Sequence, residues 1–94
     1  MMVRWTRLAV HDLDAAHEYI VQSSPSDAQH VIERIEAAVT ALTRHPRIGR
    51  AGRVSGTREL VVIGTPFIIA YRTAASGIEI LAVMHGARMW PDRF

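Results

Sequence analysis

The sequence contains no cysteine, which excludes both a disulfide framework and a thiolate metal site. It also lacks a run of about 18 apolar residues, the length that a membrane-spanning helix needs, so an integral membrane protein is excluded. The first residues do not show the charged and then apolar pattern of a secretory signal, and we therefore expect a cytoplasmic protein. Ninety-four residues are too few for two independent cores, so we expect a single domain spanning residues 1–94 and held together by packing alone.

Lysine is absent as well, and all eleven basic residues are arginine. Residues 1–43 hold three arginines and six acidic residues, whereas residues 44–94 hold eight arginines and three acidic residues. A GC-rich genome favours arginine over lysine, but it does not explain this clustering. Because the planar guanidinium binds carboxylate or phosphate in a bidentate manner, the C-terminal half is suited to an acidic partner, either protein or nucleic acid.

Apolar residues at spacings of three and four predict two adjacent helices in the first half of the chain. Alternating apolar and polar residues at 3–6 predict a short strand before them. The first helix is expected over about residues 7–22. The second begins after Ser24, a favoured capping residue, and ends at His45-Pro46, because proline disfavours helix in the residue before it. The two helices form a predicted helical hairpin.

The second half of the chain is rich in β-forming residues. Residues 47–56 show no apolar periodicity and are expected to be a loop, and three strands in an antiparallel meander are expected after it, at Thr57–Ile63, Pro66–Thr73 and Ile78–His85. Gly64-Thr65 is expected to form a two-residue turn with glycine in the first central position. The predicted fold is therefore α+β, with two helices packed on one face of a small antiparallel sheet and a tail at residues 86–94.

The expected sheet carries apolar residues on both faces. Ile68 faces away from Phe67 and Ile69, and Leu81 and Val83 face away from their apolar neighbours in the last strand. Two helices can cover only one face of a small sheet, and a large exposed apolar patch usually marks a partner site. We therefore expect another chain to cover the second face.

Two groups of polar residues have the spacing of a possible site. His11, Asp14 and Glu18 share one side of the first helix, but a solvated helix face normally carries such residues, and we expect neither a metal nor a cofactor. Arg47, Arg50 and Arg53 recur at every third residue. In an extended chain they would line one side and could bind carboxylates or phosphates, although a solvated loop would show the same composition.

These features, taken in order, resemble the RelE/ParE superfamily of toxins from bacterial type II toxin–antitoxin systems. The resemblance is carried by Trp5-Thr6, by His45-Pro46, by Arg58-Glu59-Leu60, by Tyr71-Arg72 and by the strand at residues 78–85. It covers about residues 3–91 and implies a small α/β toxin that an antitoxin neutralises.

RelE-like members of this superfamily are ribosome-dependent mRNA endoribonucleases, and usually carry an arginine three positions before a strand tyrosine. In this sequence that position is Ile68, which cannot stabilise phosphate charge. The remaining candidates for catalysis in such a nuclease are Arg58, Arg72, His85 and Arg88.

ParE-like members inhibit DNA gyrase by binding and need no acid–base set, so on this reading no catalytic residue is expected. The resemblance thus favours a gyrase inhibitor neutralised by a ParD-like ribbon-helix-helix antitoxin. The C-terminal segment of the antitoxin is expected to place apolar residues on the second face of the sheet or in the groove beside the helices, and its acidic residues are expected to meet the arginine-rich loop. Trp90 in the tail either packs on the domain or anchors a partner.

Two alternative functions remain, an endoribonuclease that acts on ribosome-bound mRNA and a non-toxic basic RNA-binding module. The residues expected to contact the target or the antitoxin are Arg47, Arg50, Arg53, Ile68, Leu81, Val83, Arg88 and Trp90.

Overall fold

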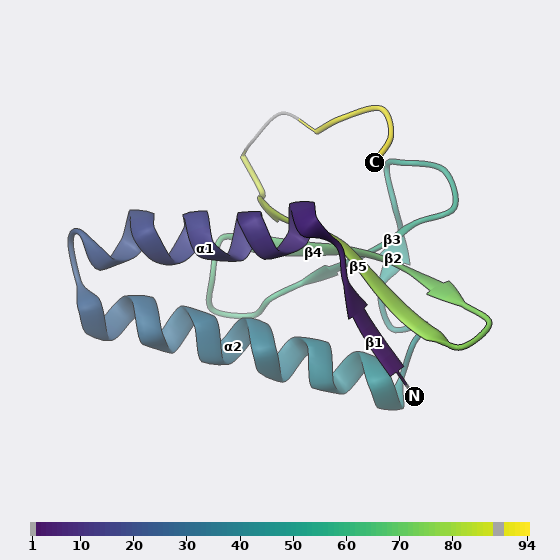
Figure 1. Cartoon of the computed structure of the whole chain (residues 1–94), viewed down its shortest axis with the longest axis horizontal. Helices are drawn as coiled ribbons and strands as arrows, with labels where there is room; N and C mark the ends of the chain where they lie inside the picture. Colours follow the sequence, from purple (N-terminus) through teal and green to yellow (C-terminus); the bar gives the residue numbers. More distant parts are fainter. Residues whose placement is uncertain (1, 88–89) are drawn as a thin grey trace.

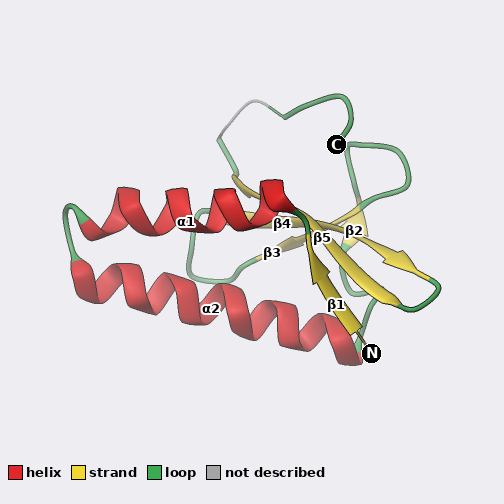
Figure 2. Cartoon of the chain, viewed as in Figure 1, coloured by secondary structure: helices red, strands yellow, loops and turns green. Residues whose placement is uncertain are grey.

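The computed structural model describes residues 2–87 and 90–94, and its elements confirm the α+β class (Figure 1). Two helices lie together on one side of a sheet of five strands (Figure 2). In chain order the elements are β1 (Met2–Trp5), α1 (Arg7–Val21), α2 (Pro25–Arg44), β2 (Arg50–Ala51), β3 (Arg58–Val61), β4 (Phe67–Ala74) and β5 (Gly77–His85).

The strand order in the sheet is β1-β5-β4-β3-β2. The predicted antiparallel meander of the last three strands is confirmed, but β1 runs parallel to β5, so the expectation of a wholly antiparallel sheet is wrong. The helical hairpin and the strands that follow it supply the long connection that a parallel pair requires. Gly77 permits this pairing, because a Cβ atom there would overlap the carbonyl of Met2.

Both helices begin at capping side chains. The hydroxyl of Thr6 accepts a hydrogen bond from the amide of Ala9 at 3.2 Å, and the hydroxyl of Ser24 accepts one from the amide of Asp27 at 3.3 Å. The predicted start of α2 after Ser24 and its end before His45 are confirmed. Within the described residues, neither helix carries an apolar stretch that could cross a membrane.

The main core lies between the helices and the sheet. Ile35 and Leu42 of α2 meet Ile69, Tyr71 and Ile80 of the sheet there, and all five are fully buried. Because these residues alternate with outward-facing neighbours along the strands, they fix which side of the sheet the helices cover.

The turn between β3 and β4 differs from the prediction. The amide of Val62 bonds to the carbonyl of Phe67, so the hairpin is closed by four intervening residues rather than two. The amide of Thr65 donates to the carbonyl of Val62, which places Gly64 third in the turn, with a φ of 79°. Positive φ in that position is what glycine permits.

An irregularity in β5 changes the faces expected for its second half. Ala70 pairs with Ala82 and Tyr71 pairs with Ile80, which leaves Leu81 without a partner in the register. A bulge of this kind reverses the alternation of side chains beyond it. Val83 therefore lies under the helices in the main core, and the expectation that it shares the opposite face with Ile68 is wrong.

The face opposite the helices is covered by the tail of the same chain. Trp90 packs on a cluster formed by Ala70, Ala82 and Met84, and Ile68 is 7% exposed. The expectation that a second polypeptide must cover this face is therefore wrong, because the chain buries it without one. Ile68 and Val83 are enclosed, and a partner could reach them only if the tail or the helices moved.

Candidate protein-interaction site

Glu59 fixes the arginine-rich loop, residues 47–56, to the sheet. Its side chain is only 1% exposed, and its Oε1 lies 3.1 Å from Nη2 of Arg50. The amide of Arg53 donates to Oε2 at 2.7 Å, and Nε of Arg53 lies 3.8 Å from Oε1. A buried carboxylate is stable only when it is paired and hydrogen-bonded. Arg50 and Arg53 thus share one carboxylate, and the carbonyl of Arg47 accepts a hydrogen bond from the side chain of Arg58.

Tyr71 fixes the beginning of the same loop. Its hydroxyl donates to the carbonyl of Pro46 at 2.8 Å and accepts a hydrogen bond from the amide of Gly49 at 2.9 Å. A Cβ atom at Gly49 would lie 2.6 Å from this hydroxyl, so no larger residue fits there without a shift. The loop is therefore held at both ends by buried polar groups.

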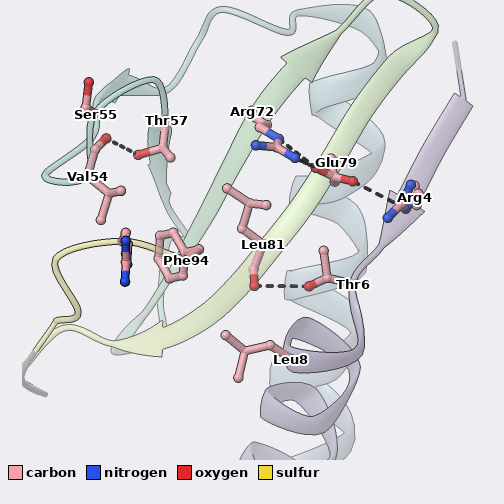
Figure 3. Close-up of a pocket in the computed structure, with 11 residues that line it drawn as sticks. Arg4, Thr6, Leu8, Val54, Ser55, Thr57, Arg72, Glu79, Leu81 and Phe94 are labelled. Atoms are coloured by element: carbon pink, nitrogen blue, oxygen red, sulfur yellow. Dashed lines mark hydrogen bonds and ion pairs between the residues drawn. The ribbon is translucent and has the colours of Figure 1, made fainter.

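Three charged residues form a row across neighbouring strands on the face opposite the helices. Glu79 of β5 is the register partner of Arg4 on β1 and of Arg72 on β4. Its Oε2 lies 3.3 Å from Nε of Arg4, and its Oε1 accepts a hydrogen bond from Nε of Arg72 at 2.6 Å. The carboxylate is nearly buried, while the two arginine side chains are 77% and 55% exposed. Figure 3 shows the row with Glu79 between the two guanidinium groups.

This row forms one side of a pocket of about 340 Å³. Figure 3 shows Phe94 of the tail and Val54 of the arginine-rich loop across from it, with Leu81 between them and the row. Thr6 donates to the carbonyl of Leu81 at 3.1 Å, so that hydroxyl is already engaged. Arg93 also lines the pocket, which thus has an arginine-rich rim and a partly apolar interior. We call it the arginine pocket.

The residues expected in a nuclease do not meet at one point. Arg58 lies opposite Tyr71 in the sheet and donates to the carbonyl of Gly49 at 2.9 Å, which directs it to the helix side. Arg72 points to the other side, toward Glu79. Arg58 and Arg72 both border a shallow pocket of about 270 Å³, but their guanidinium groups are bound elsewhere.

His85 is remote from both arginines. It ends β5, six residues beyond Glu79, which corresponds to about 20 Å along a strand. Its ring meets that of Phe67 edge-on at 5.7 Å, and its Nδ1 accepts a hydrogen bond from the amide of Ala87 at 3.1 Å. Arg88 lies outside the described residues.

A mostly apolar groove runs between α2 and β3, and none of the residues that line it is among the predicted contact residues. It has a volume of about 310 Å³ and includes the exposed side chains of Ile48, Val61 and Ile63, with Arg34 at its edge. Strand β2 pairs with β3 only at Glu59 and its neighbour Arg58, so within the described chain the outer edge of β3 beyond Glu59 has no strand beside it. We call this the α2–β3 groove.

Trp90 packs on the domain rather than standing free as an anchor for a partner. Arg53 lies over its ring, with 4.2 Å between Cζ and the ring centroid, and the ring is partly buried on the sheet. Within residues 2–87 and 90–94, no three His, Asp or Glu side chains are placed to share a metal ion.

The comparisons with known proteins agree with one another. A family described as "ParE toxin of type II toxin-antitoxin system, parDE" matches residues 3–90. The chain is 45% identical over 90 residues to "Putative toxin Y4kP" of Sinorhizobium fredii, a match that covers 96% of this chain and 93% of that protein. It is 38% identical over 87 residues to "Toxin RelE2" of Caulobacter vibrioides, with 93% and 97% covered. A solved structure titled "Chromosomal ParDE TA system from P. aeruginosa" is similar with a TM-score of 0.80 at 32% identity, covering 90% of this chain and 95% of that one.

Proposed function

The chain belongs to the ParE toxin family of type II toxin–antitoxin systems, and from this membership we propose that it inhibits DNA gyrase by protein–protein contact and is neutralised by a cognate antitoxin. Inhibition by binding requires complementary surfaces, but it requires no acid, base or nucleophile. The fixed loop, the arginine pocket and the α2–β3 groove provide such surfaces on a rigid scaffold.

The observation that carries this proposal is the separation of the nuclease candidates. Cleavage of RNA at its 2′-hydroxyl needs a base, a cation at the phosphate and a proton donor within hydrogen-bond reach of one substrate. Arg58 and Arg72 point to opposite faces, and His85 lies at the far end of β5. The position that an arginine usually occupies in the nucleases is the buried Ile68.

The α2–β3 groove is the proposed site of the antitoxin. An extended segment could pair with the open edge of β3 and place alternate apolar side chains against Val61 and Ile63, as in other cases of strand addition. Acidic residues beside this segment would meet Arg34 and the exposed Arg47. A ParD-like ribbon-helix-helix protein with an acidic, apolar C-terminal segment has this chemistry.

The endoribonuclease is the second candidate, and two observations favour it. A relative that is 38% identical is named "Toxin RelE2", and Arg58 and Arg72 border the same shallow pocket. In that case the toxin would cut ribosome-bound mRNA, and a substitution of Arg72 would abolish cleavage.

Parallel assays distinguish these functions. Purified toxin is added to a gyrase supercoiling reaction and to a translation mixture that contains a labelled mRNA. The proposal predicts loss of supercoiling with the mRNA intact, and reversal of the loss by the cognate antitoxin. Cleaved mRNA with normal supercoiling would favour the nuclease and contradict the proposal.

A further inference from the structure

We propose that the arginine pocket is the docking point for an acidic segment of the protein target, with a carboxylate on the rim and a neighbouring apolar side chain inside. This inference rests on the proposed function, because it assigns the surface that contacts the target. It concerns a surface separate from the α2–β3 groove, since the pocket lies on the face of the sheet opposite the helices.

The rim holds its cationic groups in position before any ligand arrives. Glu79 binds Nε of Arg4, and Nε and Nη2 of Arg72, so both guanidinium groups are fixed beside the pocket. Within the described residues, both Nη groups of Arg4 and Nη1 of Arg72 make no hydrogen bond or ion pair with the protein. Donors already fixed in this way lose little conformational freedom when they bind a carboxylate.

The apolar lining of the pocket favours a ligand that carries an apolar group beside its anionic group. Leu8, Val54, Leu81 and Phe94 contribute to its walls, and at about 340 Å³ it is much larger than a single carboxylate or phosphate needs. Figure 3 shows Leu81 beside the arginine row and Phe94 beyond it, across the pocket. A ligand that fills this space therefore carries an anionic group and an apolar group a short distance apart, as neighbouring side chains of a peptide do.

The charge pattern favours a peptide over a nucleic acid. Glu79 lies among the arginines and repels a chain of phosphates more strongly than it repels one carboxylate. A polynucleotide also needs a continuous basic track for successive phosphates. Arg50 and Arg53, the arginines of the adjoining loop, are instead bound to the buried Glu59.

NMR titration of the 15N-labelled full chain tests the pocket without gyrase. The probes are a ten-residue peptide of alternating Glu and Leu, the same peptide with Gln in place of Glu, inorganic phosphate, and a ten-nucleotide oligouridylate. We expect the Glu peptide alone to shift the signals of Thr6, Glu79 and Leu81 at low concentration. Shifts there caused by the oligouridylate or by phosphate but not by the peptide would overturn the proposal, and so would peptide shifts confined to the α2–β3 groove.

Substitutions with opposite expected signs separate binding from a merely structural effect. Arg4→Gln and Arg72→Gln should each lower the affinity for the Glu peptide by about tenfold, because each removes a charged donor. Glu79→Gln should strengthen binding by about threefold, because the amide oxygen of glutamine still accepts a hydrogen bond from Nε of Arg72 while the negative charge that competes with the peptide is removed. Arg44→Gln, at the end of α2 on the helix side, has the same charge change as the two arginine variants and should leave affinity unchanged. Weaker binding of the Glu peptide by Glu79→Gln would contradict the proposal. So would a loss of affinity in Arg44→Gln as large as the loss in Arg4→Gln and Arg72→Gln.

The supercoiling assay then links the pocket to the target. Arg4→Gln and Arg72→Gln should need about tenfold more toxin for half inhibition, with affinity for the cognate antitoxin unchanged. Unchanged inhibition, or an equal loss of antitoxin affinity, would overturn the assignment of the pocket to the target. If the unsubstituted toxin does not inhibit gyrase, the proposed function fails, and the peptide titration still decides whether the pocket binds acidic segments.

Discussion

Asp12 of α1 accepts a hydrogen bond from the amide of Val83 on β5, with 3.0 Å between Oδ2 and the nitrogen. Strand β1 pairs with β5 only as far as Ile80, so on that side the amide of Val83 has no strand beside it. A buried amide without a partner is costly, so the carboxylate takes the place of a neighbouring strand and joins the first helix to the last strand. Asp12 is 8% exposed, whereas most acidic side chains of the chain lie at the surface.

Asp12→Ala is expected to lower the free energy of unfolding by about 1–3 kcal/mol, because it leaves the amide of Val83 buried without this acceptor. Urea denaturation followed by circular dichroism measures the effect. The control is Asp14→Ala, an exposed position on the same helix, which should change stability by less than about 0.5 kcal/mol. Equal effects at the two positions would contradict the role given to Asp12.

Tyr71→Phe should destabilise the chain by about 1–2 kcal/mol and loosen the start of the arginine-rich loop. The substitution removes the hydroxyl that joins Pro46 to Gly49 and keeps the packing of the ring. Hydrogen exchange should be faster at the amide of Gly49. Tyr19→Phe is the matched control, since Tyr19 is 80% exposed, and unchanged exchange at Gly49 in Tyr71→Phe would refute the prediction.

Glu59→Gln should release the side chains of Arg50 and Arg53 and cost about 1–3 kcal/mol of stability, because a charge-assisted bond to the amide of Arg53 is weakened. Thermal unfolding monitored by calorimetry gives the magnitude. Glu36→Gln makes the same substitution at an exposed glutamate of α2 and should leave the stability almost unchanged. A Glu59→Gln protein as stable as the parent would show that the loop is held by other contacts.

Trp90→Ala should expose the cluster of Ala70, Ala82 and Met84 that the tail covers. We expect stronger fluorescence of a hydrophobic dye such as ANS and a loss of stability of about 1–2 kcal/mol, in line with the partial burial of the ring. Phe94→Ala removes another ring of the same tail that does not pack on this cluster, and it should leave dye binding low. Equal dye binding by Trp90→Ala and by the unsubstituted chain would mean that Trp90 does not cover the cluster.

Ile63→Arg should weaken binding of the cognate antitoxin by roughly thirtyfold, about 2 kcal/mol, if the α2–β3 groove is its site. The side chain is 80% exposed, so folding should be little affected. Val10→Arg places the same charge at an exposed position of α1 outside the groove and serves as the control. Calorimetric titration with purified antitoxin measures both, and equal affinities would exclude the groove.

Local sequence signals were sufficient for the helices and for the meander. Ser24 and His45-Pro46 act through the backbone of their own segments, and the structure places the ends of α2 where these residues predict. The pairing of Arg72 with Glu79 could also have been derived, because the two positions are equally distant from the turn between Ala74 and Gly77.

The features that the sequence did not predict depend on contacts between distant segments. The bulge at Leu81 and the close approach of the first strand to Gly77 are tertiary properties, so neither the burial of Val83 nor the place of Arg4 beside Glu79 follows from alternation. The position of the tail is also a tertiary property, and the alternation of residues along the strands could not show that Trp90 would cover the sheet.

The most direct test of the account is the amount of toxin that stops gyrase. A protein that acts by binding should inhibit supercoiling only as it approaches molar equivalence with the enzyme, and an equimolar amount of antitoxin should restore activity. Gyrase at a fixed, known concentration is therefore titrated with the purified chain, and supercoiling is quantified at each ratio. Half inhibition near half an equivalent and full inhibition near one toxin per gyrase site are the predicted results, and undiminished supercoiling at a large excess of toxin would contradict them.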